Sequence, residues 1–448
     1  MRDTDPRLAP SQRDPVVAAA TELVGGPLGR FARVSPSWQP AVAVLAALAS
    51  VFVSLGVLEK SHCLLYGWKD PDQYWHMCYS DLPLSLPGTG SSTLPYVTGG
   101  GSPGQPVVTG FAMWLIGLAV PPGRTGFTHQ QWYFALAAIA ITILLVLLVV
   151  VTAATVPDTP WRAAHVALSP VLVTAGLISL DLLGVLLAAL GLLAWVRRWP
   201  ALAGVALGLA ALARTYPVVI VLAIGIVAWR DGHVQRFARL FVAAVVTVLV
   251  VLVPLVVASP GSGRADPVLA PYVSWWDGVV SYGSPWLIPD LFGRQLPVVV
   301  VTMLAVLGWV AAVVAGALFA MGPGRRPSVA QVSFMMVAIV LVTGKSMTLQ
   351  SVLWLLPLIA LVGLRWRDHL IWAGVEVTAF LATWLYAAQS FDANRALPGP
   401  DYAIFLVARI VAVGWLVWQV WRQATMQGLR AVPGAVGPPH LTMIRHDG

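Results

Sequence analysis

Charged residues are scarce in this chain. Asp, Glu, Lys and Arg together make up 10% of its 448 residues and 58% are hydrophobic, whereas a soluble domain carries roughly a quarter charged residues. So few charges cannot cover a water-facing surface, which means that a lipid bilayer should surround most of the chain. Strict apolar/polar alternation is also missing, and this disfavours a β-barrel. We therefore predict an all-α polytopic membrane protein.

Other absences exclude classes of function. The sequence contains no Walker loop and no dinucleotide fingerprint, which argues against a nucleotide-driven pump and a cytosolic nucleotide-sugar enzyme. His62, His76 and His129 lack the spacing of metal ligands, so the sequence predicts no metal and no cofactor. The formal net charge of +8 does not indicate a nucleic-acid partner, because the arginines lie between the apolar runs rather than in one patch.

The apolar runs predict about a dozen membrane spans. Several are shorter than the ~20 residues of a full span, but short segments are tolerated where they line a cavity inside the protein. The predicted spans cover residues 41–58, 132–155, 163–178, 180–196, 201–213, 217–229, 240–258, 296–321, 329–343, 352–364, 370–388 and 403–421.

The positions of Lys and Arg predict the orientation. Counting the run 107–120 as a span would place four arginine clusters outside, against the positive-inside rule. Treated as a helix on or dipping into the outer face, it leaves 18 of the 27 Lys and Arg inside and 8 outside, with Arg409 within the last span. We expect a plasma-membrane protein whose single transmembrane domain (41–425) lies between cytoplasmic tails (1–40 and 426–448).

This topology leaves three outer loops, at residues 59–131, 259–295 and 389–402. Loops as long as the first two are usually functional. Both cysteines, Cys63 and Cys78, lie in the first loop. An oxidising compartment would allow a disulfide between them. Two free thiols are the alternative, and the sequence leaves the choice open.

Three carboxylates are candidates for chemistry. Asp81, in the first outer loop, could deprotonate an acceptor hydroxyl or cap a turn before Pro83. Asp181 lies at the outer end of two spans, where an ionisable residue predicts a function, although it could equally cap the helix that starts at Leu182. Glu376 lies within an apolar run, so it should have a partner or face a cavity; a transporter would use it for protons.

Two cations lie on the predicted outer face, against the positive-inside preference. They are Arg214, in Arg214-Thr215-Tyr216-Pro217, and Lys345, in Gly344-Lys345-Ser346. A phosphate ligand would explain both. The alternative is that each side chain extends to the lipid headgroups.

Four stretches together carry a family resemblance. They are Cys78-Tyr79-Ser80-Asp81-Leu82-Pro83 with Leu94-Pro95-Tyr96 and Pro106-Val107-Val108-Thr109-Gly110; Asp181 with Arg214-Thr215-Tyr216-Pro217; Tyr282-Gly283-Ser284-Pro285-Trp286; and Gly344-Lys345 with Gln350 and Leu353-Trp354-Leu355-Leu356-Pro357, then Trp372 and Glu376. Their order and spacing resemble glycosyltransferase family 87, the multi-span C-type glycosyltransferases of actinobacteria that use polyprenyl-phosphate sugars. The family often has Glu-Tyr where this chain has Gly104-Gln105, and its usual Lys is Arg214 here.

The resemblance implies a C-type glycosyltransferase fold whose long first outer loop carries the catalytic Asp, which maps onto Asp81. It implies inverting transfer of mannose or arabinofuranose from a polyprenyl phosphate to a cell-envelope glycolipid or glycan, without a metal. A lipid-linked sugar transporter and a non-catalytic relative are the alternatives. The residues expected to contact donor or substrate are Tyr79, Ser80, Asp181, Arg214, Tyr216, Lys345, Gln350, Trp354 and Glu376.

Overall fold

The computed structural model describes residues 38–84, 93–97, 104–259, 261, 263, 266–324 and 326–431, and every regular element in this part of the chain is a helix. Short 3₁₀ helices are labelled η. In chain order the elements are α2 (Gln39–Glu59), α3 (Ser61–Tyr66), α4 (Asp72–Trp75), α5 (Asp81–Leu84), α6 (Val107–Leu118), α7 (Gly126–Thr155), η2 (Pro160–Ala163), α8 (Ala164–Ala167), α9 (Val171–Ala175), α10 (Asp181–Val196), α11 (Pro200–Ala213), α12 (Pro217–Arg230), α13 (Val234–Ala258), α14 (Ala270–Asp277), η4 (Pro285–Leu287), α15 (Ile288–Leu291), α16 (Val298–Met321), α17 (Val329–Thr343), η5 (Leu349–Leu355), α18 (Leu356–Val362), α19 (Trp366–Ala387), η6 (Ala388–Ser390), η7 (Ala393–Arg395) and α20 (Gly399–Ala431).

Six of the described helices are long and apolar enough to cross a bilayer, namely α2, α7, α13, α16, α19 and α20. The outward surface of α13 is apolar, with exposed Val246, Leu249, Val250 and Val253. Water would not favour such a surface, whereas lipid tails would. The prediction of a membrane-embedded, all-α protein is confirmed at this level. The shorter apolar helices have 10–17 residues and include α6, α10, α11, α12 and α17.

Two predicted spans are interrupted rather than single α-helices. Residues 163–178 are divided among the end of η2, α8 and α9, and α9 begins after Pro170. Residues 352–364 begin in the 3₁₀ helix η5 and continue into α18, which ends at Gly363 with φ +71°. Proline lacks the N–H that a continuous helix needs, and Gly363 adopts the left-handed conformation without a Cβ penalty.

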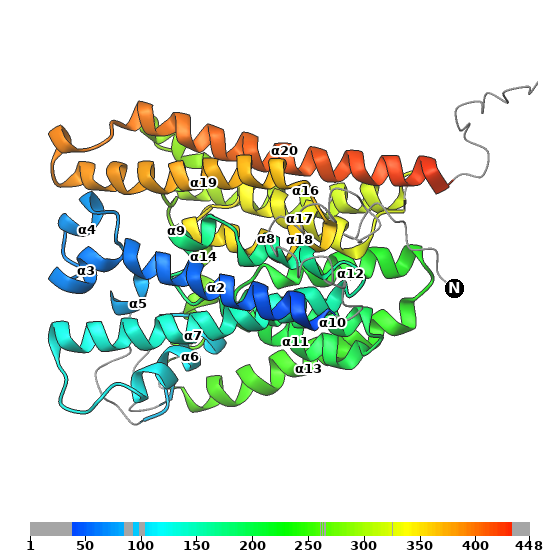
Figure 1. The fold of residues 1–448 in the computed structure, drawn as a ribbon, viewed down its shortest axis with the longest axis horizontal. Helices are drawn as coiled ribbons and strands as arrows, with labels where there is room; N and C mark the ends of the chain where they lie inside the picture. Colours follow the sequence, from blue (N-terminus) through cyan, green and yellow to red (C-terminus); the bar gives the residue numbers. More distant parts are fainter. Residues whose placement is uncertain are drawn as a thin grey trace, which may run out of the picture.

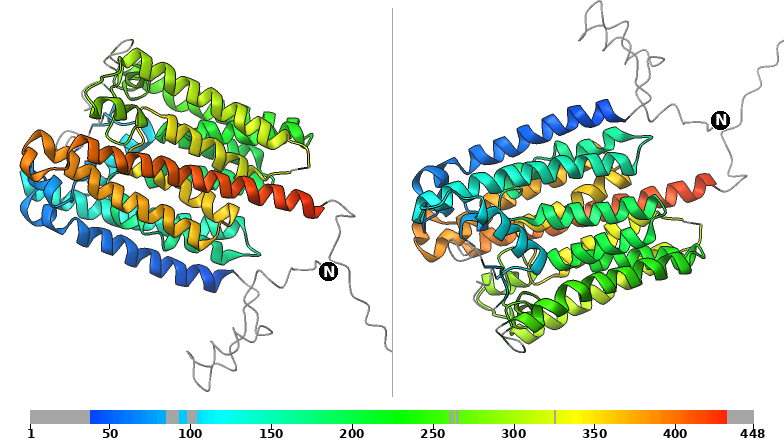
Figure 2. Two further views of the ribbon diagram at one scale, coloured as in Figure 1. Left: turned by 90° about the horizontal axis from the view of Figure 1, so that it is seen from above. Right: turned by 90° about the horizontal axis from the view of Figure 1, so that it is seen from below.

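The helices of the bundle run roughly along its long axis (Figures 1 and 2). The N-terminal end of α2 and the C-terminal end of α20 lie at the same end of the bundle. The short helices α3 and α4 lie at the opposite end, beside the turn between α19 and α20. If the N- and C-terminal tails lie on one side of a membrane, as predicted, then the start of α2 and the end of α20 must lie at the same end of the bundle. Apart from residues 38–40 and 426–431, those tails lie outside the described residues.

Candidate functional site

Hydrogen bonds to backbone carbonyls bring the segment around Asp81 against the start of α10. The hydroxyl of buried Ser80 donates to the carbonyl of Leu177 at 2.7 Å, and the Asp81 amide donates to the carbonyl of Ile178 at 2.9 Å. The acceptors lie in the turn that leads into α10, whose first residue is Asp181. Two carboxylates separated by a hundred positions of sequence therefore lie at one site.

Asp181 is buried and accepts hydrogen bonds from three side chains. The Arg214 guanidinium reaches its Oδ1 from Nε at 2.9 Å and from Nη2 at 2.8 Å, and the Ser179 hydroxyl donates to the same oxygen. The indole of Trp354 donates to Oδ2 at 3.2 Å. The predicted capping role fails, because Leu180 is the N-cap and Asp181 is the first helical residue. Its carboxylate holds side chains together instead.

Arg214 retains donors beyond this ion pair. Its Nη1 donates to the amide oxygen of Gln105 at 3.1 Å. A guanidinium has five N–H donors, and the three bonds to Asp181 and Gln105 leave two for another acceptor. Burial disfavours the charged guanidinium, but the Asp181 carboxylate outweighs it and raises the pKa of Arg214. At Gln105 a neutral amide oxygen accepts the bond.

A small cavity lies between these groups. The space that a water-sized sphere can occupy in it is only about 10 Å³, far below the ~300 Å³ at which ligand pockets usually begin. One wall is fixed by the Thr109 hydroxyl, which donates to the carbonyl of Ala213 at 3.1 Å. The cavity therefore suits one reacting group rather than a whole ligand. Among described residues it is lined by Asp81, Leu82, Gln105, Thr109, Met113, Ser179, Leu180 and Arg214.

Burial raises the pKa of the Asp81 carboxyl above its ordinary value. Two neighbours oppose this effect: the Tyr79 hydroxyl, which donates to Oδ1 at 2.7 Å, and the charge of Arg214. The nearby Asp181 carboxylate adds to the upward shift. A carboxyl with a raised pKa is a better proton acceptor than an ordinary Asp. This is the electrostatic setting expected of a general base.

An aromatic cluster packs beside Asp81. The ring of Tyr79 lies 4.6 Å from that of Trp384 and 5.9 Å from that of Tyr74, measured between centroids. Tyr74 also stacks on Phe391, whose side chain is half exposed. Sequence reasoning selected Tyr79 but missed the other three, because they come from α4, α19 and the turn after α19. We call Tyr74, Tyr79, Trp384 and Phe391 the aromatic cluster.

Lys345 is not among the described residues that line the cavity. Its ammonium donates to the carbonyls of Trp275, Trp276 and Gly278 at 2.8–3.1 Å and lies over the Trp275 ring. Three acceptors match the three hydrogens of an ammonium group. Lys345 therefore binds the C-terminal end of α14, where cations are favoured.

The remaining predicted residues lie in two places. The ring of Tyr216 packs 5.4 Å from that of Trp354, close to Asp181, and Gln350 lies half-buried in η5. Glu376 lies on α19, where its carboxylate accepts a 2.8 Å bond from Arg409 of α20. The prediction that Glu376 needs a partner is confirmed, and the partner is a cation on the adjacent helix.

The structure settles the open question about the two cysteines. Cys63 and Cys78 form a disulfide with a Cα–Cα distance of 5.7 Å.

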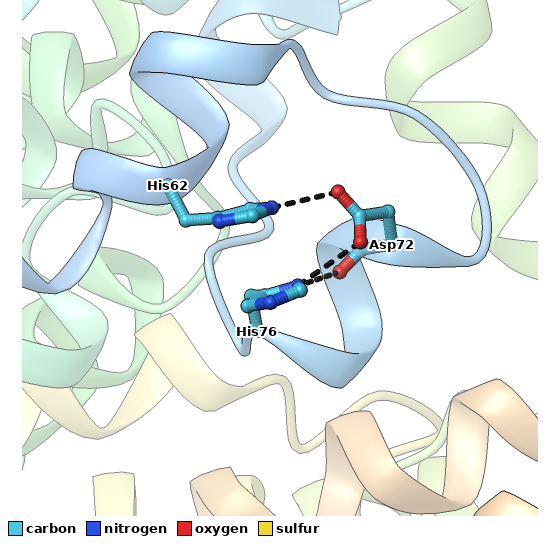
Figure 3. A group of neighbouring side chains, drawn as sticks. All are labelled: His62, Asp72 and His76. Atoms are coloured by element: carbon cyan, nitrogen blue, oxygen red, sulfur yellow. Dashed lines mark hydrogen bonds and ion pairs between the residues drawn. The ribbon is translucent and has the colours of Figure 1, made fainter.

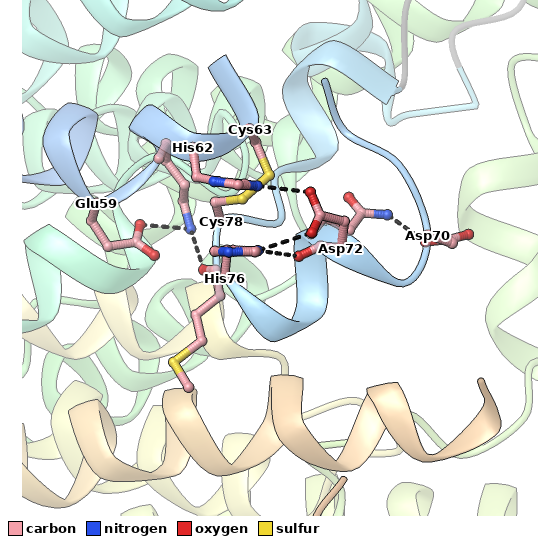
Figure 4. The surroundings of a disulfide bond; sticks show 10 residues. Glu59, His62, Cys63, Asp70, Asp72, His76 and Cys78 are labelled. Carbon is pink, nitrogen blue, oxygen red and sulfur yellow. Dashed lines mark hydrogen bonds and ion pairs between the residues drawn. A yellow bond between two sulfur atoms is a disulfide. The ribbon is translucent and has the colours of Figure 1, made fainter. Parts of the chain in front are cut away.

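The fold also gathers His62, Asp72 and His76, whose potential metal-ligand atoms lie within 4.8 Å of one another (Figures 3 and 4). The sequence spacing did not predict this group, because its members come from α3, from α4 and from the residue that ends α4. His129 is separate, buried on α7.

A search of protein-family models finds no match to this chain, and neither does a search of curated proteins.

Proposed function

We propose that this protein is an inverting membrane glycosyltransferase that takes a sugar from a polyprenyl-phosphate donor. The observation that carries the proposal is the environment of Asp81. Its carboxyl has a raised pKa, accepts a bond from Tyr79 and shares a small cavity with the guanidinium of Arg214. The ordered motifs around Asp81, Asp181, Arg214 and Lys345, which resemble glycosyltransferase family 87, support the same function.

The proposed reaction is a single displacement at the anomeric carbon. Asp81 removes the proton from an acceptor hydroxyl as its oxygen bonds to that carbon. The bond from carbon to phosphate oxygen breaks, its electron pair stays on the phosphate, and polyprenyl phosphate leaves. The configuration inverts because the acceptor attacks from the face opposite the leaving group. The proton finishes on Asp81 and passes to water.

Arg214 is the proposed contact for the phosphate. Its two remaining N–H groups can bind an oxygen of the leaving group, and charge developing there strengthens those bonds. We assign to Asp181 the role of fixing the orientation of this guanidinium, which it binds directly. Ser179 and Trp354 donate hydrogen bonds to Asp181 and so hold its carboxylate in place. Lys345 then has a structural role, because its three hydrogens already bind carbonyl oxygens.

The proposal includes twelve membrane crossings with the Asp81 end outside the plasma membrane. In this topology the six long helices are joined by shorter apolar segments, including η2–α8–α9 and η5–α18, whose residues are mostly buried. The acceptor is a cell-envelope glycolipid or glycan, and the donor sugar is mannose or arabinofuranose. The aromatic cluster beside Asp81 offers rings against which a sugar can pack.

A lipid-linked sugar transporter is the second candidate. It is favoured by two carboxylate–guanidinium pairs among the apolar helices, Asp181 with Arg214 and Glu376 with Arg409. Such pairs can open and close a path as they exchange partners. Transport would move the donor across the bilayer without forming a new glycosidic bond.

The experiment is reconstitution of purified protein in vesicles with a polyprenyl-phosphate sugar and a crude glycolipid extract. Separate reactions contain the mannose and the arabinofuranose donor. We expect product from one donor, none with Asp81→Asn, and undiminished product with Asp401→Asn, a matched control at an exposed Asp of α20. Transfer by Asp81→Asn would overturn the role of Asp81. Donor movement across the vesicle without product would establish the transporter instead.

A further inference from the structure

A second group of side chains lies in the first loop, away from the described lining of the Asp81 cavity. His62 Nε2 lies 2.7 Å from Asp72 Oδ2, and His76 Nδ1 lies 3.1 Å from Asp72 Oδ1. The two imidazoles are stacked, with centroids 3.4 Å apart and planes 6° from parallel. Figure 3 shows both rings presenting a nitrogen to the same carboxylate. One potential ligand atom from each of the three residues therefore already lies within 4.8 Å of the others.

We propose that His62, Asp72 and His76 bind one divalent cation of the zinc class. Two imidazoles and one carboxylate form a ligand set that zinc uses in open sites, with water in the remaining position. Magnesium and calcium prefer sets made only of oxygen ligands. The site therefore discriminates by ligand type, and nickel and copper are its expected competitors.

The observed distances define the rearrangement that binding requires. With metal–ligand bonds of about 2.0–2.1 Å, neighbouring donors around a tetrahedral zinc lie about 3.3 Å apart. The two nitrogen–oxygen distances, 2.7 Å to Oδ2 and 3.1 Å to Oδ1 of Asp72, are shorter than this by about 0.2–0.6 Å. The two parallel imidazoles would also have to tilt so that both ring nitrogens point at one cation. The cation would replace the hydrogens that now lie between the imidazoles and the carboxylate. The three side chains are 28–46% exposed, which leaves room for a water ligand.

The surrounding loop holds the ligands in place. The Cys63–Cys78 disulfide lies directly beside them, adjacent in sequence to His62 and two positions after His76 (Figure 4). At the start of the loop, Lys60 is buried, pairs with Glu59 at 2.8 Å and donates to the Met77 carbonyl. This pair anchors the backbone on both sides of the site. A preorganised site loses less entropy when a cation binds.

The cation would also hold the wall of the candidate active site. Asp72 and His76 flank Tyr74, and Tyr74 stacks on Tyr79, whose hydroxyl binds Asp81. A metal joining α3 to α4 would therefore fix one side of the aromatic cluster. This structural consequence holds whether or not the protein transfers a sugar.

The test is zinc uptake by protein carrying no histidine tag, with the disulfide intact. Protein is stripped with a chelator, dialysed against zinc chloride and analysed for bound metal, and affinity is measured by calorimetry. We expect close to one zinc per chain in the unaltered protein. His62→Ala and His76→Ala should each weaken binding at least about tenfold, because even residues that only orient a ligand change affinity by that much. His233→Ala, at an exposed histidine before α13, should bind normally.

Thermal melting gives an independent readout. Zinc should raise the Tm of the unaltered protein and of His233→Ala, whereas magnesium at equal concentration should not. Neither the Tm of His62→Ala nor that of His76→Ala should rise with zinc when each is compared with the same variant in chelator, because each variant also loses its own contact to Asp72. If one variant fails to fold, the other still decides the result, with Asp72→Asn as a third. Absent uptake by the unaltered protein, or equal uptake by all variants, would overturn the proposal.

Discussion

The hydroxyl of Tyr79 donates a 2.7 Å hydrogen bond to Oδ1 of Asp81, two residues further along the chain. The same bond that orients the carboxylate also stabilises its charged form and so lowers the pKa that burial has raised. Burial, with the nearby Asp81 carboxylate a smaller influence, raises the pKa of Tyr79 itself well above the ordinary value, so the phenol stays protonated and remains a donor. The strength of the proposed base is therefore controlled by a neighbour on the same loop.

Replacing Tyr79 by Phe should raise the pKa of Asp81, because the bond that favours its ionised form is lost. A hydrogen bond to a charged group contributes about 1.5–3 kcal/mol, and one pKa unit corresponds to about 1.4 kcal/mol. The acidic limb of the pH–rate profile for transfer should therefore move upward by about one to two pH units. Tyr66→Phe, at an exposed tyrosine of α3, serves as the control. A profile identical to that of the unaltered protein would show that the bond does not govern the base.

Replacing Asp81 by Asn should abolish transfer without loss of stability. Because the folded protein raises the Asp81 pKa, it binds the proton more tightly than the unfolded chain, whose pKa is about 3.9. The associated stability is complete below that pH and is lost as pH rises through the folded-state pKa. At neutral pH the Asn variant should therefore melt at the same Tm or higher, with the difference shrinking toward pH 4. A large fall in Tm would instead identify Asp81 as a structural residue.

Replacing Arg214 by Gln should destabilise the protein by about 3 kcal/mol, the lower end for breaking a buried ion pair. The cost arises because buried Asp181 would lose its charged partner, and it is moderated because 21% of the Arg214 side chain is exposed. The double variant Arg214→Gln with Asp181→Asn should recover much of the loss. Thermal melts of the single and double variants measure the coupling. Simple addition of the two single losses would show that the pair is not coupled.

The Glu376–Arg409 pair should behave as a structural pair between α19 and α20. Both side chains are at most 2% exposed and their atoms lie 2.8 Å apart. Arg409→Met alone should cost about 3–5 kcal/mol, because it leaves an uncompensated charge, and adding Glu376→Leu should restore stability. Melting of the single and double variants is the measurement. If the double variant is stable but no longer moves donor across vesicles, the pair belongs to a transport path.

Gly204 should be intolerant of a side chain, because α11 and α13 approach closely there. A Cβ at this position would collide with the Leu240 carbonyl and lie 2.9 Å from the Ala244 amide nitrogen, both backbone groups. Gly204→Ala should therefore lower Tm. Gly374→Ala on α19, where a Cβ meets nothing within 4 Å, should be neutral or stabilising by up to about 1 kcal/mol through helix propensity. Equal responses at the two positions would contradict the close contact.

The sequence alone determined that lipid surrounds this protein and where most of its helices lie. A chain with 10% charged residues and long apolar runs must bury its backbone hydrogen bonds in helices when lipid surrounds it. The run ending at Thr343 matches α17 at both ends, because hydrophobic length is a local property. The selection of Asp81, Asp181 and Arg214 also came from the chain itself, through motifs that lie near one another in the fold.

Tertiary structure decided which of these residues meet. Local sequence cannot reveal that Asp181 binds Arg214 while Lys345 binds the end of α14, since both cations look alike between two apolar runs. The partner of Glu376, the Cys63–Cys78 bridge and the gathering of His62, Asp72 and His76 were equally hidden. Each depends on distances between atoms of separate segments of the chain, which side-chain packing fixes only after the bundle has formed.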